Sequence, residues 1–329
     1  MNLPTSVPDV AFGDVGLTTD GLWHSSFRSM ASPIRLQLGP DSPDPQRLQA
    51  EVRALFGEVE RQCTRFDPGS DLMRANAAGA APTEVGVHCF AALQAALLAH
   101  QATSGRFDPR VLTVLRDLGY GSSLPFNDGP VRTETVDREP EPVSGTWRPR
   151  FDPATRRVAI GGVPVDLGGI GKGLALRWAA ELLRAGGCTT FLLDAGGDCV
   201  FGHGPEGDPW RIGVEDPAGA EGPVAVLEAA DGACATSSVR LRQWQAGERR
   251  VHHLIDPRTG RPGGGNLRSV TVVGTDPADA EVWSKVLFLA GDRIGAEAAE
   301  RKLAALWVDG AGRSEHSPAL TPYLIWERG

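Results

Sequence analysis

The sequence has few cysteines, methionines and tyrosines, and its shortages exclude several classes of protein. It contains five cysteines, three methionines and two tyrosines among 329 residues. The cysteines show no CxxC spacing, so neither a zinc site nor a disulfide framework is indicated, and we expect reduced, mostly buried thiols. No apolar run is long enough to span a bilayer. Basic residues are not in excess either: the formal charge of −8 argues against a large basic surface for duplex nucleic acid.

The beginning of the chain lacks the signals of export. The first 25 residues have no apolar segment behind basic residues and no cysteine for lipid attachment. We therefore expect a soluble, cytoplasmic protein without a membrane anchor. The 41 glycines and 25 prolines indicate many turns and rather short elements.

The pattern of apolar residues predicts a mixture of helices and short strands. Helical spacing is found over residues 45–65, 86–103, 277–291 and 293–302. Strands predominate from Val158 onward and several are joined by short turns, which predicts an α+β fold with largely antiparallel sheets. Turn residues throughout 64–79 predict a surface loop there.

The same pattern divides the chain unevenly. Residues 1–26 mix Pro, Gly, Ser and Thr with isolated apolar residues and are expected to be a loose N-terminal extension. Residues 27–329 are expected to form the folded domain. Within it, residues 122–150 carry proline, glycine and alternating charge with little periodicity, so we expect a flexible insertion between two lobes.

A glycine-rich turn before an apolar helix is the first candidate for a binding site. The segment "VDLGGIGKG", residues 165–173, fails the P-loop pattern because Asp166 and Gly173 stand where Gly and Ser or Thr are required. Its glycines are spaced two and two, so it also fails the dinucleotide fingerprint. Glycines, a helix N-terminus and the Lys172 ammonium together suit a phosphate. A tight strand-to-helix turn with a solvent-facing lysine explains the segment equally well.

Several separated segments, taken together, resemble the ApbE family, the FAD:protein FMN transferases. They cover roughly residues 27–291 in one collinear order, and although each is weak alone, the ordered set is specific. The segments are "SMASPIRLQL", "TRFDPGSDLMRANAAG", "TSGRFDPRV", "VDLGGIGKG", "LLDAGGDCVFG", "WRIGVEDP", "ATSS", "VHHLIDPRTGRP" and "AEVWSKVLFLAG".

The resemblance implies a two-lobed, T-fold-related α+β structure with FAD in the cleft between the lobes. The FAD-binding residues that it implies are Met30, Phe66, Arg106, Phe107, Asp108, Asp166, Lys172, Gly197 and Asp198. For several of these residues a purely structural role is an alternative. Met30 and Phe66 suit an ordinary core, Asp108 before a proline suits a helix cap, and the turn at Gly197 suits a structural bend.

The family's reaction, as the resemblance implies it, is phosphoryl transfer. A threonine hydroxyl of a client protein attacks the FMN-side phosphorus of FAD, and AMP leaves. The reaction needs a base and cationic screening of the diphosphate. His252 and His253 point to opposite sides of a strand, so only one is expected to reach the cleft. The family's pattern makes His253 the base, and the alternative is that it only hydrogen-bonds the following Asp-Pro turn.

The expected metal site departs from the family's pattern. The family usually binds Mg²⁺ through a backbone carbonyl of the glycine turn, here Gly169, and through an Asp and a Thr one helical turn apart. This sequence has Glu281 and Lys285 at those places. Glutamate can replace aspartate as an oxygen ligand, but an ammonium cannot coordinate a cation.

Three interpretations of this departure compete. In the first, Glu281 and Lys285 form an ordinary i, i+4 pair and the metal is lost. In the second, the Lys285 ammonium, held by Glu281, replaces Mg²⁺ beside the diphosphate. In the third, the local register shifts and Ser284 or Asp279 binds the metal. We favour the second, because an anionic cleft gives the ammonium two partners. The sequence therefore predicts an FMN transferase with FAD as substrate and a client flavoprotein as partner. The alternative is an FAD-binding relative that has lost transfer and acts as a flavin carrier or partner protein.

Overall fold

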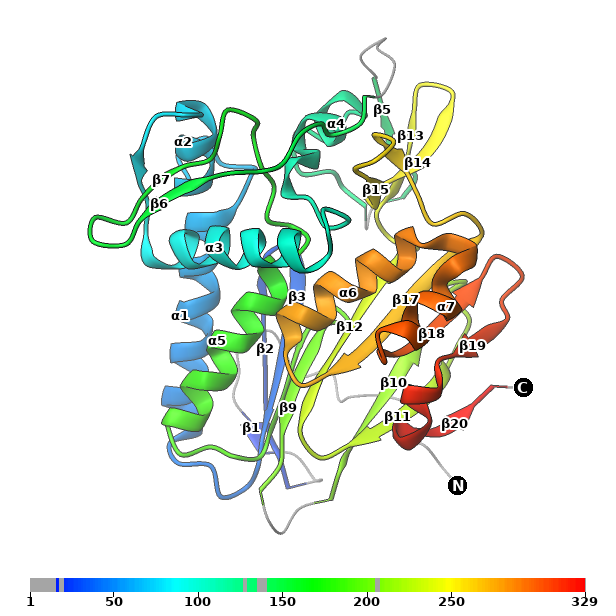
Figure 1. Ribbon diagram of the computed structural model, residues 1–329. Helices are drawn as coiled ribbons and strands as arrows, with labels where there is room; N and C mark the ends of the chain where they lie inside the picture. Colours follow the sequence, from blue (N-terminus) through cyan, green and yellow to red (C-terminus); the bar gives the residue numbers. More distant parts are fainter. Residues whose placement is uncertain (1–15, 18–20, 127–128, 135–140, 205–207, 329) are drawn as a thin grey trace.

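The computed structural model describes residues 16–17, 21–126, 129–134, 141–204 and 208–328. Within these ranges the largest sheet has nine strands, and every neighbouring pair is antiparallel (Figure 1). Across the sheet the order is β1 (Gly16–Leu17), β2 (Trp23–Ser29), β3 (Ser32–Leu38), β8 (Phe191–Ala195), β9 (Cys199–Gly202), β12 (Gly232–Ser238), β17 (Leu267–Gly274), β18 (Ala304–Asp309) and β19 (Ser314–His316).

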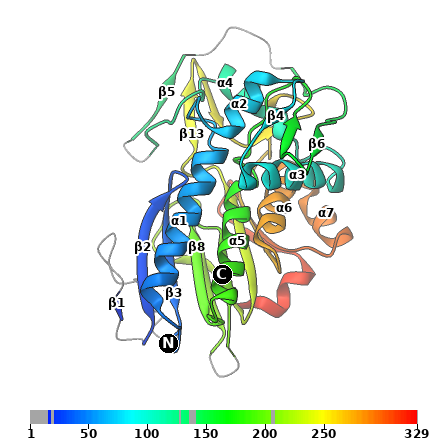
Figure 2. The ribbon, with the colours of Figure 1, turned by 90° about the vertical axis from the view of Figure 1, so that its left-hand side faces the viewer.

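Helices cover one face of this sheet. They are α1 (Pro45–Cys63), α5 (Gly171–Ala185), α6 (Pro277–Leu289) and α7 (Ile294–Glu300), with the short helix η2 (Gly291–Arg293) before α7. Figure 2 shows α1 and α5 running side by side over the strands at the β2–β3 end. On α1, Leu48, Val52 and Phe56 recur at four-residue spacing and are completely buried, because this spacing places them on the face toward the sheet.

The opposite face is covered by a small antiparallel sheet. It contains β10 (Trp210–Glu215), β11 (Pro223–Ala229) and β20 (Leu324–Glu327), which follows the short helix η3 (Pro318–Tyr323). Successive side chains of β18 point to opposite faces of the main sheet: Leu306 packs toward this small sheet, while Trp307 packs toward α6 and α7. The main sheet is therefore buried on both faces in this region.

A second lobe stands above the sheet in Figure 1, as the sequence pattern and the family resemblance predict. Its helices are α2 (Asp71–Ala78), α3 (Val87–Ala102), η1 (Pro109–Val111) and α4 (Leu112–Asp117). Its strands are β4 (Thr83–Glu84), β5 (Arg132–Thr133), β6 (Arg150–Asp152), β7 (Arg157–Ala159), β13 (Gln243–Ala246), β14 (Arg249–His252), β15 (Ile255–Asp256) and β16 (Arg261–Pro262). Among the described helices, none has the length and apolar character that crossing a membrane requires.

Two boundary predictions were wrong. Strand β2 begins at Trp23, inside the expected extension of residues 1–26, because it pairs with β3 along its whole length. The loop expected at 64–79 contains α2, whose N-cap Ser70 accepts a hydrogen bond from the N–H of Met73. The turn-forming residues before Ser70 lead into the N-terminus of this helix and do not extend beyond it.

The expected insertion at 122–150 is partly fixed to its surroundings. Residues 127–128 and 135–140 lie outside the described part of the chain. In the remainder, Trp147 is buried and its indole N–H donates to the Ile160 carbonyl oxygen at 2.8 Å. The carbonyls of Ser144 and Gly145 accept hydrogen bonds from a buried arginine, Arg110. The C-terminal end of the segment is therefore part of the upper lobe.

Candidate active site

A cavity of about 430 Å³ lies where the two lobes meet. The upper lobe contributes the segments around Phe66 and Phe107, and the hairpin of β13 and β14 contributes His253. The main lobe contributes the glycine turn at 166–172 and the C-terminal half of α6. Of the residues predicted from the sequence, the cavity is lined by Met30, Phe66, Arg106, Phe107, Asp108, Asp166, Gly169, Lys172, His253 and Lys285; Gly197, Asp198 and Glu281 lie outside its lining.

The glycines of the turn are required by close packing. A Cβ atom on Gly173 would lie 2.5 Å from the backbone of Ala278, so this glycine lets α5 and α6 approach each other. A Cβ on Gly169 would lie 2.9 Å from the Phe107 ring and 3.4 Å from Cδ of Lys285. The turn thus brings its backbone directly against the aliphatic stem of Lys285.

Glu281 and Lys285 form a closed pair beside this turn. Glu281 is 1% exposed, and its Oε2 accepts a hydrogen bond of 2.8 Å from the N–H of Gly173. Its Oε1 lies 3.1 Å from the Nζ atom of Lys285, whose side chain is 18% exposed. Both carboxylate oxygens are therefore engaged, and the ammonium lies between the carboxylate and the cavity.

A divalent metal does not fit these residues. The two oxygen ligands that a register shift would supply are not available to a metal in the cavity. Ser284 is completely buried and hydrogen-bonds to Ser237, and the Asp279 side chain is 77% exposed. The described residues contain no group of three carboxylate, histidine or cysteine side chains that could hold a metal ion. Lys285, whose stem lies against Gly169, ends in an ammonium, which cannot coordinate a metal cation and repels it.

His253 presents a neutral imidazole to the cavity. Its backbone N–H and its ring Nδ1 both lie within hydrogen-bond distance of the Arg242 carbonyl oxygen, at 3.2 Å and 3.3 Å. A carbonyl only accepts, so the ring proton is on Nδ1 and the lone pair is on Nε2. Burial, together with the charges of Arg242 and Lys285, holds the pKa of His253 well below its ordinary value of 6.5. The ring is therefore a proton acceptor at neutral pH.

His252 lies on the other side of the strand, as the alternation predicts. It does not line the cavity, and its ring packs edge-on against Phe288 with centroids 5.9 Å apart. Burial lowers the pKa of His252 to about 4. One histidine of the pair thus reaches the cavity, and the other packs against α6.

Comparisons with known proteins agree with this architecture. A model of the ApbE family matches residues 30–307. The chain belongs to the ApbE family. The FAD:protein FMN transferase of Vibrio cholerae is 28% identical over 264 residues, which are 79% of this chain and 78% of the relative. The enzyme of that name from Klebsiella pneumoniae is 26% identical over 304 residues, 88% of this chain and 86% of the relative.

Solved ApbE structures share the fold. The ApbE protein of Thermotoga maritima superposes with a TM-score of 0.80 at 24% identity, over 94% of this chain and all of the other. The flavin transferase ApbE of Vibrio cholerae gives a TM-score of 0.74 at 24% identity, over 92% and 98%. The predicted α+β fold with largely antiparallel sheets is confirmed by this agreement.

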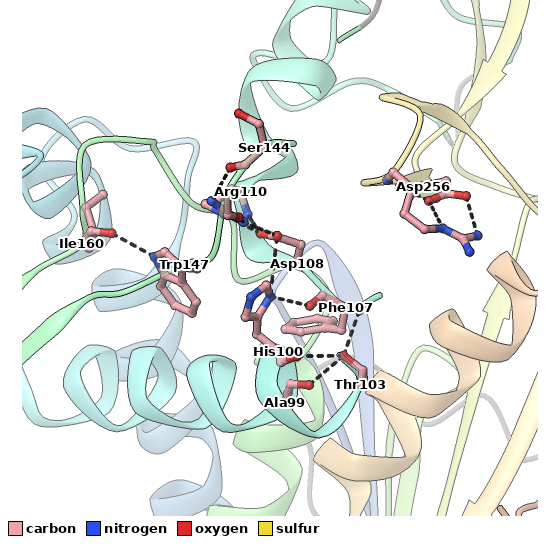
Figure 3. A network of polar contacts seen from close by, with 12 residues as sticks. Ala99, His100, Thr103, Phe107, Asp108, Arg110, Ser144, Trp147, Ile160 and Asp256 are labelled. Carbon is pink, nitrogen blue, oxygen red and sulfur yellow. Dashed lines mark hydrogen bonds and ion pairs between the residues drawn. The ribbon is translucent and has the colours of Figure 1, made fainter. Parts of the chain in front are cut away.

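In this ApbE-family chain, three predicted FAD contacts have polar roles within the protein. The Asp108 carboxylate is 4% exposed and accepts hydrogen bonds from the backbone N–H and guanidinium of Arg110, with His100 Nδ1 3.5 Å away (Figure 3). This arrangement matches the cap alternative. Lys172 forms an ion pair with Asp198, which also accepts from the backbone N–H of Thr236 at 2.9 Å. Asp198 thus holds Lys172 at the edge of the cavity.

The other predicted positions vary in their surroundings. Arg106 lines the cavity and is held by Glu297, its Nη2 lying 2.7 Å from Oε1. Gly197 has φ of +95°, and its N–H donates to the Asp194 carboxylate at 3.0 Å. Its position outside the cavity lining favours the structural-bend alternative.

Arg65 and Tyr120 are cavity residues that the sequence analysis missed. The Arg65 guanidinium lies 4.2 Å from the ring centroids of both Phe66 and Tyr120. Its Nη1 donates to the Tyr120 carbonyl oxygen at 2.6 Å, and its Nε lies 3.7 Å from Oδ2 of Asp166. Arg65 could have been found from the sequence, because it directly precedes Phe66, which was predicted to contact FAD. No sequence pattern linked Tyr120 to it, because only the fold brings them together.

Proposed function

We propose that the protein is an FAD:protein FMN transferase. The observation that carries the proposal is a cavity between the two lobes of an ApbE-family fold, lined by both a neutral histidine, His253, and a lysine ammonium, Lys285. The names of the relatives support the same activity. The cavity volume of about 430 Å³ falls within the range usual for sites that bind small molecules.

In the proposed reaction, the hydroxyl oxygen of a client threonine attacks the FMN-side phosphorus of FAD. The new P–O bond forms as the bond from that phosphorus to the bridging oxygen breaks, and AMP leaves with the electron pair. Nε2 of His253 takes the threonine proton, since the residue lines the cavity and its Nδ1 is held by the Arg242 carbonyl, which leaves the Nε2 lone pair unused. The proton then passes from the imidazolium to solvent.

We propose that Lys285 supplies the positive charge that a metal would otherwise supply. Glu281 holds the Lys285 ammonium in place, and the aliphatic part of the Lys285 side chain passes beside Gly169. A monocation screens a diphosphate less well than a divalent ion, so turnover is expected to be slow. Phe66, Phe107 and Met30 are proposed to form the apolar walls against the flavin nucleotide, and Asp166 and Lys172 its polar contacts.

The test is a transfer assay read by mass spectrometry. The purified protein is incubated with FAD and a client flavoprotein domain that has an acceptor threonine, in the presence of a chelator. The expected result is a client heavier by one FMN, with AMP released in equal amount. A client whose threonine is replaced by valine is the control. Tight FAD binding with no gain in client mass would contradict the proposal and leave a flavin-binding protein. The cytoplasmic location expected from the sequence stays a prediction, which cell fractionation tests.

A further inference from the structure

Arg242 occupies the position directly across the hairpin from His253. In the ladder of β13 and β14, Gln243 pairs with His252, so the next pair outward is Arg242 with His253. The hydrogen bond from the His253 N–H to the Arg242 carbonyl oxygen, at 3.2 Å, extends the ladder to this pair. Paired residues of antiparallel strands project to the same side, and both residues line the cavity.

Arg242 also differs from the other cations of the cavity. Within the described residues, Arg65, Arg106, Lys172 and Lys285 each lie within ion-pair distance of a carboxylate. The Arg242 side chain is half-buried, and among the residues that the structure describes it has neither an ion-pair partner nor a hydrogen-bond acceptor. A cation that is partly removed from water without a counterion is unfavourable, and an anionic ligand in the cavity would compensate it.

The chemistry of the side chain indicates which anion. A guanidinium presents a planar fork of N–H donors that matches two oxygens of a phosphate, whereas an ammonium binds as a point charge. We propose that the Arg242 guanidinium binds the diphosphate of the flavin dinucleotide beside His253, as a second cation in addition to Lys285. This inference rests on the proposed function, because it takes the diphosphate of FAD as the ligand.

The charge arrangement supports this assignment. Arg242, Lys285 and His252 are the charged and titratable groups that act on His253, and each lowers its pKa. Arg242 and Lys285 therefore lie near the same imidazole while coming from different lobes, one from the hairpin and one from α6. Together they carry two positive charges, the charge of one divalent ion, of which Glu281 offsets part.

The test compares ligand binding by four proteins: wild type, Arg242→Gln, Arg242→Lys and Arg249→Gln. Arg249 is exposed on the same hairpin, pairs across it with Ala246 and does not line the cavity, so its replacement removes an equal charge elsewhere. The probes are FAD, ADP and riboflavin, which lacks phosphate. Affinities are measured by flavin fluorescence and, for ADP, by calorimetry. The thermal midpoint of each variant checks folding, and Arg242→Lys against wild type decides the matter if Arg242→Gln does not fold.

Arg242→Gln is expected to weaken FAD and ADP binding by about tenfold to a hundredfold and to leave riboflavin binding unchanged. Arg242→Lys is expected to fall between, and Arg249→Gln to match wild type. In NMR titrations the pKa of His253 should rise in Arg242→Gln and stay the same in Arg249→Gln. Wild-type affinity of the Arg242 variants for ADP, or equal loss of riboflavin and FAD binding, would overturn the inference.

The transferase proposal and the Arg242 site can be overturned independently of each other. If the wild type transfers no FMN but binds ADP in an Arg242-dependent way, the transferase proposal fails and the Arg242 site stands. If transfer occurs and Arg242→Gln binds both diphosphates normally, the transferase proposal stands and the Arg242 site is wrong. A wild type that binds neither FAD nor ADP overturns both.

Discussion

The Nζ atom of Lys285 lies 3.1 Å from Oε1 of Glu281, one turn earlier on α6, and the lysine stem passes beside the backbone of Gly169. These are the three positions where the family resemblance predicts a metal site. Here a carboxylate holds an ammonium at that place, and the carboxylate's other oxygen is bound by the Gly173 N–H. We therefore expect transfer without a divalent ion.

Restoring the family's residues should restore dependence on metal. In the double variant Glu281→Asp with Lys285→Thr, oxygen ligands replace the ammonium, so transfer is expected to require Mg²⁺ and to stop with chelator. Wild-type transfer is expected to be unaffected by chelator, as measured by client mass. Glu281→Asp alone keeps the ammonium and is the control. An identical response to Mg²⁺ in the double variant and the wild type would count against this placement of the site.

His253 and His252 provide a matched pair for testing the base. His253→Gln is expected to lower the transfer rate by about 10²–10⁴-fold, because it removes the imidazole that is proposed to take the proton, and to leave FAD affinity unchanged. His252→Gln alters a ring that packs against Phe288 outside the cavity and is expected to keep the wild-type rate. Equal rates in the two variants would show that His253 is not the base.

The pH dependence of transfer follows from the lowered pKa of His253. The base is active when neutral, and the charges of Arg242 and Lys285 add to burial in keeping it neutral well below pH 6.5. The rate is therefore expected to stay constant between pH 8 and about 6.5 and to fall only at lower pH. A half-maximal rate near pH 6.5 would mean that the catalytic group has an unperturbed pKa.

The same two histidines should make the fold sensitive to acid. His252 has a pKa of about 4 in the folded protein, and that of His253 is also lowered, against 6.5 when unfolded. Between these values the unfolded chain binds more protons, so the free energy of unfolding falls as the pH drops from about 6.5 to about 4. Urea denaturation across this range measures it, and His252→Gln should flatten the curve. A stability independent of pH in this window contradicts the burial of both rings.

Lys172 and Asp198 are expected to be strongly coupled. Lys172→Met leaves the Asp198 carboxylate, 2% exposed, without its cation and should lower the free energy of unfolding by about 3–5 kcal/mol. Asp198→Asn in the same protein should recover most of that loss, because it removes the uncompensated charge. Additive losses in this double-mutant cycle would show that the ion pair does not form.

The sequence predicted most of the fold and of the cavity lining where local pattern and family order agree. The long helices α1, α3 and α6 were visible as apolar periodicity, and the motifs identified Gly169 and His253, which both line the cavity. What it could not predict depends on the fold. Arg242 becomes a cavity residue only through its register with His253, and Tyr120 only through the aromatic contacts with Arg65. Helix α2 was missed because its N-cap follows turn-forming residues.

The most direct test of the account is a crystal structure of the protein grown with FAD and Mg²⁺. We expect the diphosphate in the cavity between the lobes, within hydrogen-bond distance of the Lys285 ammonium and the Arg242 guanidinium, with no metal ion at Gly169. An octahedral ion bound between the Gly169 carbonyl and the diphosphate, with Lys285 turned away, would contradict it.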